Sequence, residues 1–314
     1  MPGENLTRIE AAERAALVSV NSYDVDLDLT TSDRTFRSTT TVKFACHTPG
    51  ASTFIDAITD KVHAVTLNGV ELDPATVSDN VRIQLDNLQA ENVLTVDADA
   101  LFMNTGEGLH RFVDPVDNEV YLYSQFEVPD SRRMYAVFEQ PDLKATFKFT
   151  VTAPKHWKVV SNQPTPAARE IGDNKAVWEF APTPVISSYI TALVAGPYVE
   201  YRSELTSTDG RTIPLGVFCR ASLAEFMDQA EADYVFEKTR EGFDYFEKAF
   251  GVAYPFEKYD QLFVPEFNAG AMENAGCVTF TETYVFRSKP TDAIRERRVI
   301  TILHELAHMW FGDL

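Results

Sequence analysis

The chain has 314 residues and a formal net charge of −19, from 47 acidic and 28 basic side chains. This excess of negative charge repels a polyanion, so we expect no nucleic-acid partner. Hydrophobic residues make up 45% of the chain, which is enough for a packed core and argues against intrinsic disorder. The length suits one large domain or two ordinary ones.

The N-terminal end has no basic start followed by an apolar stretch, and no segment reaches the length of about 18 apolar residues that a membrane span needs. Cys46, Cys219 and Cys277 are odd in number and far apart, and they form no C-x-x-C pattern. Buried free thiols in a reducing compartment are the simplest interpretation. We therefore expect a cytoplasmic protein without membrane contact, and a monomer.

Residues from about 17 to 200 predict short strands with hardly a helix between them. The run from Tyr23 to Leu29 alternates apolar and acidic residues, which is the period-two pattern of a half-buried strand. Similar runs occur at 65–72, 93–97, 120–126, 147–152, 176–180 and 189–194. The pattern predicts an N-terminal domain over residues 1–200 that is an antiparallel β-sandwich or saddle of sheets.

Residues 201–314 predict a second domain of α/β character. Strands are predicted at 202–205, 213–219, 259–264 and 278–286. A long helix is predicted from Ser222 to Phe250, with Ser222 and Glu225 as a capping box and Gly251 as the stop.

A final helix is predicted over residues 293–311, capped by Thr291 or Asp292. It is apolar on nearly all sides, so we expect it to be buried. This helix carries the sequence HELAH at residues 304–308.

His304 and His308 are four residues apart and share one helix face. Both imidazoles can therefore bind one metal ion at about 2.0–2.1 Å, the usual zinc–nitrogen distance. Glu305 is placed to act as general base toward water activated by the metal. The alternative is a pair of ordinary histidines on an amphipathic helix, but two buried imidazoles and a buried carboxylate need partners, which a metal supplies. We predict one Zn²⁺ ion per subunit.

Two histidines are too few ligands for a catalytic zinc ion, which takes three protein ligands and a water. Six residues follow His308, and none is Glu or His. Either an upstream residue supplies the third ligand or the chain is the front part of a longer protein, and we expect the second.

A second informative stretch, residues 268–276, contains two glycines that would let the backbone approach a ligand closely. It could equally be a turn before the strand that follows. From the residues alone, both interpretations stay open.

The sequence GAMEN at Gly270–Asn274, with 29 residues between it and HELAH, resembles the M1 family of zinc aminopeptidases in order and spacing. The runs YPFEKYDQLFVPEF at 254–267 and SQFEVPDSRRMYAVFEQPDLKATF at 124–147 are similar to further family stretches. The resemblance extends from about residue 20 to the end of the chain and is strongest to the actinobacterial cytosolic group. One departure is FEQP at 138–141 in place of the usual F-D-E-P, a run that we interpret as structural.

The resemblance implies that residues 201–314 begin a thermolysin-like zincin catalytic domain. It implies zinc binding by His304 and His308 and a general base at Glu305. It further implies a third-ligand Glu about nineteen residues after His308, with an oxyanion-stabilising Tyr beyond it. A piece that lacks both would bind zinc weakly and turn over little substrate, which zinc stoichiometry and hydrolysis of an aminoacyl-anilide would test.

The resemblance also implies a substrate site for peptides with a free N-terminus. Glu273 and Glu127 would bind the α-amine, with Gln125 close to the first side-chain pocket. The backbone around Gly270 and Ala271 would pair with the extended substrate as an added strand. Met272 and Asn274 complete the same motif.

Other functions stay open at this point. The same scaffold could serve an endopeptidase or an epoxide hydrolase, and a non-catalytic M1-like binding protein is a further alternative. Blocking the amine of the substrate should abolish an aminopeptidase and spare an endopeptidase.

Overall fold

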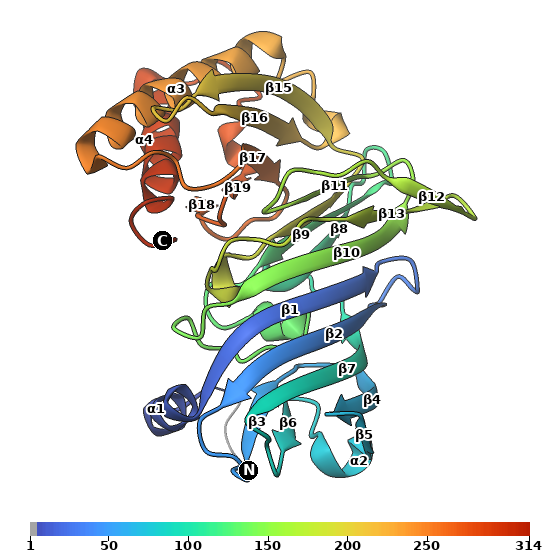
Figure 1. Cartoon of the computed structure of the whole chain (residues 1–314). Coiled ribbons are helices and arrows are strands. Elements are labelled where there is room, and N and C mark those ends of the chain that lie inside the picture. The colour runs from blue at the N-terminus through green and yellow to red at the C-terminus, as the bar shows by residue number, and fades with distance from the viewer. Residues whose placement is uncertain (1–4) are drawn as a thin grey trace. The chain divides into compact units, whose positions relative to one another are not determined.

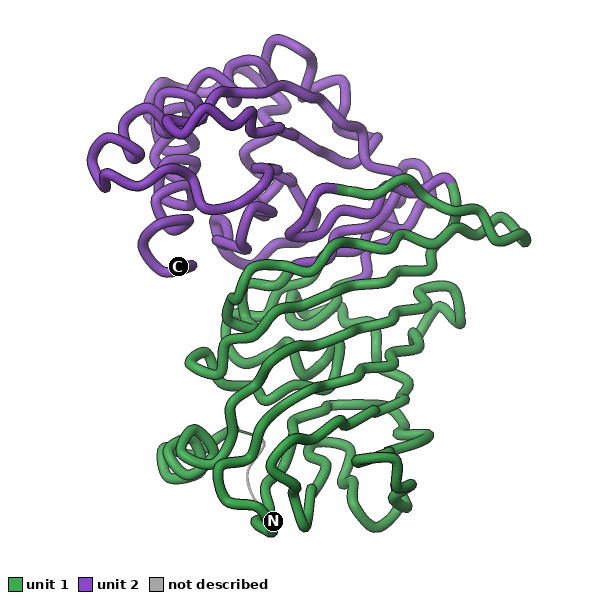
Figure 2. Tube along the Cα trace, viewed as in Figure 1, with its two compact units in different colours: residues 1–110, 124–155, 165–191 green, residues 111–123, 156–164, 192–314 purple. Residues whose placement is uncertain are grey.

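The computed structural model describes residues 5–314, which form two compact units (Figures 1 and 2). Unit 1 takes in the described residues up to 110, together with 124–155 and 165–191. Unit 2 takes in residues 111–123, 156–164 and 192–314. The chain thus enters unit 2 three times. The division of functional domains near residue 200 stays a prediction.

An eight-stranded sheet forms the frame of unit 1 (Figure 1). Its strands, in spatial order, are β12 (Arg169–Gly172), β13 (Lys175–Glu179), β10 (Thr146–Pro154), β1 (Val18–Asp28), β2 (Thr35–Cys46), β7 (Glu91–Leu101), β4 (Lys61–Leu67) and β5 (Val70–Leu72). All neighbours are antiparallel except β1 and β10, which run parallel. The expected antiparallel β-domain is therefore confirmed, with one parallel pair that strand periodicity alone does not reveal. The long chain between the two strands allows it, because a parallel pair needs a crossover connection.

The alternating run predicted to be a strand buries one face, as expected. Along β1, Tyr23, Val25 and Leu27 are at most 2% exposed. The ring of Tyr23 stacks on Phe147, with ring centroids 4.7 Å apart, and its hydroxyl accepts a hydrogen bond from the backbone N–H of Phe138 at 3.1 Å. Unit 1 also contains β3 (Thr53–Asp56), β6 (Arg82–Leu85), α2 (Pro74–Val77) and the short 3-10 turns Ser131–Arg133 and Ser188–Ile190.

The N-terminal helix α1 (Arg8–Leu17) is an element that the sequence analysis missed. Its capping box pairs Thr7 with Glu10. Its buried Arg14 donates to Asp56 at 2.6 Å and to Gln140 at 3.2 Å. Because Gln140 belongs to the FEQP run, these contacts support the structural interpretation of that run.

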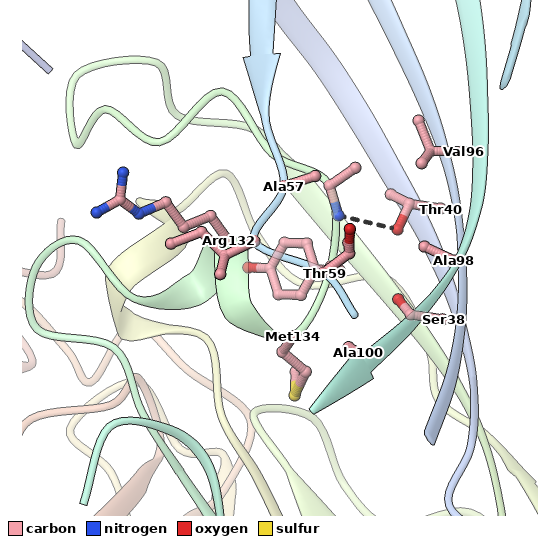
Figure 3. Close-up of a pocket in the computed structure, with 12 residues that line it drawn as sticks. Ser38, Thr40, Ala57, Thr59, Val96, Ala98, Ala100, Arg132 and Met134 are labelled. Carbon is pink, nitrogen blue, oxygen red and sulfur yellow. Dashed lines mark hydrogen bonds between the residues drawn. The ribbon is translucent and has the colours of Figure 1, made fainter. Parts of the chain in front are cut away.

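A small cavity of about 10 Å³ lies in unit 1 between the sheet and the segment around Met134 (Figure 3). Small side chains of the sheet line one wall, and the backbone N–H of Ala136 donates to Thr40 there at 3.3 Å. The volume suits about one water molecule. The cavity contains none of the predicted site residues, so we infer no ligand site in it.

A four-stranded sheet lies mostly in unit 2 and has the order β11 (Lys158–Ser161), β14 (Leu193–Gly196), β9 (Val120–Gln125) and β8 (Gly108–Val113). A five-stranded mixed sheet has the order β15 (Val199–Thr206), β16 (Thr212–Cys219), β17 (Tyr259–Val264), β19 (Cys277–Thr281) and β18 (Ala271–Met272). The helix α3 (Gln229–Phe250) joins the parallel strands β16 and β17. All six residues of β17 are buried, which is typical of a central parallel strand. The predicted fold class, a β-domain followed by α/β structure, is confirmed.

The predicted start of the long helix is wrong. The helix begins after Asp228, whose side chain accepts from the backbone N–H of Glu231 at 3.0 Å. Ser222 cannot cap it, because its hydroxyl is bonded to Asp114 and Arg220. The predicted stop is confirmed, since Gly251 ends the helix with a left-handed φ of 68°.

Two predicted strands are shorter than expected. The strand expected over 278–286 ends at Thr281, and a 3-10 turn (Glu282–Tyr284) follows. There Glu282 leaves the sheet to form an ion pair with Arg220 at 2.7 Å. The strand expected over 189–194 is a 3-10 turn followed by β14.

The three cysteines are free and buried, as predicted. Within the described residues, no helix combines the length and the apolar character that crossing a membrane requires.

Candidate metal centre

The helix α4 (Asp292–His308) carries the histidine pair. Thr291, one of the two predicted caps, accepts from the backbone N–H of Ile294 at 3.3 Å. The helix ends three residues before the predicted limit, and it is not buried on all sides: Ile300 is 50% exposed and His304 is exposed. The expectation of two buried histidines is therefore wrong. One apolar face of α4 packs on the rest of unit 2, while the other faces solvent.

Close packing against α3 fixes the position of α4. A β-carbon added at Gly242 of α3 would lie 2.6 Å from a methyl group of Leu303 and 2.7 Å from one of Leu306. Any larger residue at position 242 would therefore force both leucine side chains to shift, and glycine lets the two helices pack without this change. Arg298, which is fully buried, donates to Glu231 of α3 at 2.8 Å. The helix is thus held on α3 in both its first and its second half.

The two imidazoles face each other, with their Nε2 atoms 3.2 Å apart and their ring planes at 82°. Two nitrogens that bind one tetrahedral ion at about 2.0–2.1 Å lie about 3.3–3.4 Å apart. One ligand atom from each of His304, Glu305 and His308 lies within 4.8 Å of the others. The donor set therefore fits a zinc ion held by two neutral imidazoles, with a carboxylate beside it.

The ring of His308 is oriented by a carbonyl that the sequence analysis missed. Its Nδ1 lies 3.1 Å from the carbonyl oxygen of Phe311. In the neutral tautomer that donates from Nδ1–H to this oxygen, Nε2 has the lone pair that binds a metal. Every residue has a backbone carbonyl, so the sequence does not indicate which one accepts from His308. The contact becomes visible only in the structure of the turn after α4.

The side chain of Glu305 is buried in the interior of unit 2, and the residue is 5% exposed. It lies near Tyr259 at the start of β17: burial raises the pKa of Tyr259 well above its usual value, and the carboxylate of Glu305 raises it further. The tyrosine therefore stays protonated near neutral pH. This position separates Glu305 from solvent while leaving it beside the two imidazoles.

The GAMEN residues form the end of the five-stranded sheet. Strand β18 pairs only with β19 in the strand order, with Ala271 opposite Phe280 and Met272 opposite Thr279. The carbonyl of Gly270 accepts from the N–H of the residue that ends β19, at 3.0 Å. The second edge of β18 is thus the edge of the sheet, where an extended peptide could add.

The residues after β18 form a turn beside α4, which packs against β18. Glu273 is half-buried, whereas Asn274 is fully buried. The side-chain amide of Asn274 donates to the hydroxyl of Thr279 at 3.3 Å. The backbone carbonyl of Asn274 accepts from the backbone N–H of Cys277 at 2.9 Å. Glu273 and the histidine pair both belong to unit 2.

The other predicted substrate residues lie in unit 1. Gln125 is half-buried at the end of β9, and Glu127 is exposed in the turn that follows. Their approach to the histidine pair stays a prediction.

Comparison with known proteins identifies two family domains in the chain. Residues 19–190 match the family model described as the peptidase M1 N-terminal domain, and residues 234–314 match the peptidase family M1 domain. The first match alone covers more than half of the chain.

Several curated proteins are similar to this chain. Aminopeptidase N of Streptomyces lividans is 61% identical over 317 residues, covering 100% of this chain and 36% of the relative. Aminopeptidase N of Acetobacter pasteurianus is 36% identical over 62% of this chain and 52% of its own length. Tricorn protease-interacting factor F2 of Thermoplasma acidophilum is 28% identical over 94% of this chain and 35% of its own length. The chain thus spans between about a third and a half of these relatives.

Proposed function

The chain belongs to the peptidase M1 family, and from this premise we propose that the protein is a zinc-dependent aminopeptidase acting on peptides with a free N-terminus. One observation carries the proposal: the Nε2 atoms of His304 and His308 lie 3.2 Å apart, with the buried Glu305 beside them. The similarity to two proteins named aminopeptidase N supports the same activity.

His304 and His308 would hold one zinc ion, because their facing Nε2 atoms have the spacing of two ligands of one ion. A bound zinc ion supplies Lewis-acid chemistry, which polarises a carbonyl and makes water more acidic. A hydrogen bond donated by Nδ1–H of His308 to the Phe311 carbonyl would hold the ring with Nε2 directed at the ion.

Glu305 would act as general base. Its carboxylate would accept a proton from the attacking water and later give it to the nitrogen of the departing amine. Burial keeps bulk water from this carboxylate, so the proton stays within the site.

Glu273 would bind the α-ammonium group of the substrate, together with Glu127. An ammonium held at a fixed distance from the metal allows only the first peptide bond to reach it, which distinguishes an exopeptidase from an endopeptidase. The backbone of Gly270 and Ala271, at the edge of the sheet, would pair with the extended peptide. Gln125 would lie close to the first side-chain pocket.

The cytoplasmic location, the monomeric state and the absence of a nucleic-acid partner are parts of this proposal. The net charge of −19 supports the last of these.

Glu305→Gln tests the general base, with Glu296→Gln as the matched control on the exposed face of α4. In the zinc-loaded full-length protein, Glu305→Gln should lower kcat for an aminoacyl-nitroanilide by about 10²-fold or more and leave the zinc content unchanged. The control should keep full activity. Unchanged turnover in Glu305→Gln would contradict the assigned role.

A second experiment compares the cleavage of one peptide in two forms, with a free and with an acetylated N-terminus. The proposal expects cleavage of the free peptide alone. Equal cleavage of both would favour an endopeptidase on the same scaffold.

A further inference from the structure

The turn that follows Glu273 is held by three buried side chains from distant parts of unit 2. Asn162 donates from its side chain to the carbonyl of Ala275 at 2.9 Å. Lys258 donates from Nζ to the carbonyl of Gly276 at 2.8 Å. The backbone N–H of Gly276 donates to the sulfur of Met309 at 3.3 Å. We name Asn162, Lys258 and Met309 the loop anchor; all three are at most 4% exposed.

The ammonium group of Lys258 also forms an ion pair with Asp260. Its Nζ lies 2.9 Å from one carboxylate oxygen of Asp260, and the other oxygen accepts from Arg202 at 2.7 Å. Lys258 is 2% exposed and Asp260 is 1% exposed. A buried ammonium is costly even when paired, and an apolar side chain would fill this space more cheaply. What the ammonium adds is a directional, charge-assisted hydrogen bond to the Gly276 carbonyl.

Gly276 packs closely against the backbone of Lys258. Its φ is +64°, and an added β-carbon would lie 2.9 Å from the carbonyl oxygen of Lys258. That carbonyl also accepts from the hydroxyl of Tyr254 at 2.8 Å. The backbone N–H of Asp260 donates to the Gly276 carbonyl at 3.0 Å. Backbone and side chain thus fix the same carbonyl from two directions.

The third member of the anchor connects the turn to the candidate metal centre. Met309 directly follows His308, the last residue of α4. Its bond to Gly276 joins the turn after Glu273 to the end of the helix that carries the histidine pair. The two parts of the site in unit 2 are therefore coupled through one buried contact.

We propose that Lys258, Asn162 and Met309 are positioning residues that fix the distance between Glu273 and the histidine pair. They act through the turn and do not touch the substrate. Fixing this distance sets how far the substrate's ammonium group lies from the metal, and so how well the first peptide bond is presented. This inference rests on the proposed role of Glu273 in amine binding.

Lys258→Met tests the anchor, because methionine keeps most of the apolar stem and removes the ammonium. Met309→Leu is a second variant that keeps the volume and removes the sulfur acceptor. Arg220→Met is the matched control: Arg220 is a buried arginine of unit 2 that is paired with Asp114 at 2.6 Å. Its hydrogen bonds go to Asp114, Ser222 and Glu282, none of which belongs to the turn. Zinc content and thermal midpoint are measured for each variant.

Hydrogen exchange followed by mass spectrometry reports on the turn without reference to activity. Lys258→Met and Met309→Leu should speed exchange in peptides that cover residues 270–277 by about tenfold or more, and Arg220→Met should not. In the zinc-loaded full-length protein, Lys258→Met should raise KM for an aminoacyl-nitroanilide by about ten- to a hundredfold, the range expected for loss of a charge-assisted hydrogen bond, with a smaller change in kcat.

Unchanged exchange in both anchor variants overturns the inference, and so does a rise in KM that Arg220→Met reproduces. If the wild-type protein fails to hydrolyse any aminoacyl substrate, the proposed function falls, while the exchange experiment still decides whether the anchor holds the turn.

Discussion

Trp310 offers the sharpest test of how the end of the metal-binding helix is held. Its side chain is 8% exposed and packs against four aromatic rings whose centroids lie 5.7–6.1 Å away: Phe243, Phe246, Phe250 and Tyr254. Its indole N–H donates to the carbonyl of Val252 at 2.9 Å. Because the residue lies two positions after His308, this cluster fixes the turn that brings the Phe311 carbonyl to His308.

Trp310→Ala should lower the free energy of unfolding by about 3–5 kcal/mol, since it removes a large buried side chain and leaves a cavity among the rings. Trp310→Phe keeps a ring and loses the hydrogen bond, so it should cost about 1–2 kcal/mol. Phe311→Ala is the matched control, because Phe311 is the neighbouring aromatic residue and is 78% exposed. It should change the free energy of unfolding by about 0.5 kcal/mol or less.

Urea titration followed by circular dichroism measures these differences, with the slope m compared between variants. The reasoning fails if Phe311→Ala destabilises as much as Trp310→Ala, or if Trp310→Ala costs less than about 1 kcal/mol.

Two further predictions concern other parts of the chain. Hydrogen bonds from Arg82 and from Thr7 lower the pKa of Glu10 from 4.5 to about 2, so this carboxylate stabilises the fold fully above its unfolded pKa of 4.5 and progressively less as the pH falls toward 2. The difference in free energy of unfolding between wild type and Glu10→Gln should therefore shrink between about pH 5 and pH 3 in urea titrations, and a difference that widens with acid would contradict this assignment. Gly276→Ala should destabilise the chain by about 1–3 kcal/mol, because alanine is strained at a φ of +64° and its β-carbon would meet the Lys258 carbonyl at 2.9 Å; a thermal midpoint equal to that of wild type would show that the turn can relax.

The sequence by itself determined the local features of this protein. The HELAH spacing places His304 and His308 on one helix face, and the structure has them on one helix with facing nitrogens. The period-two run at Tyr23 marked a strand with one buried face, and Gly251 marked the end of a helix. Each of these depends on residues a few positions apart, so the chain sequence contains the whole cause.

Tertiary structure decided whatever depends on a partner far along the chain. Ser222 had the residue type and spacing of a helix cap, but Asp114 lies 108 positions earlier and takes its hydroxyl. His304 is exposed because the opposite face of α4 packs on the rest of unit 2. Periodicity cannot specify which face packs when both faces are apolar.

The anchor of the turn shows the same limit. Lys258 donates to Gly276, and Met309 accepts from it across 33 positions. The sequence contains these residues without any spacing rule that joins them. Only folding brings the charge, the carbonyl and the sulfur together, because a hydrogen bond depends on distance in space and not on distance along the chain.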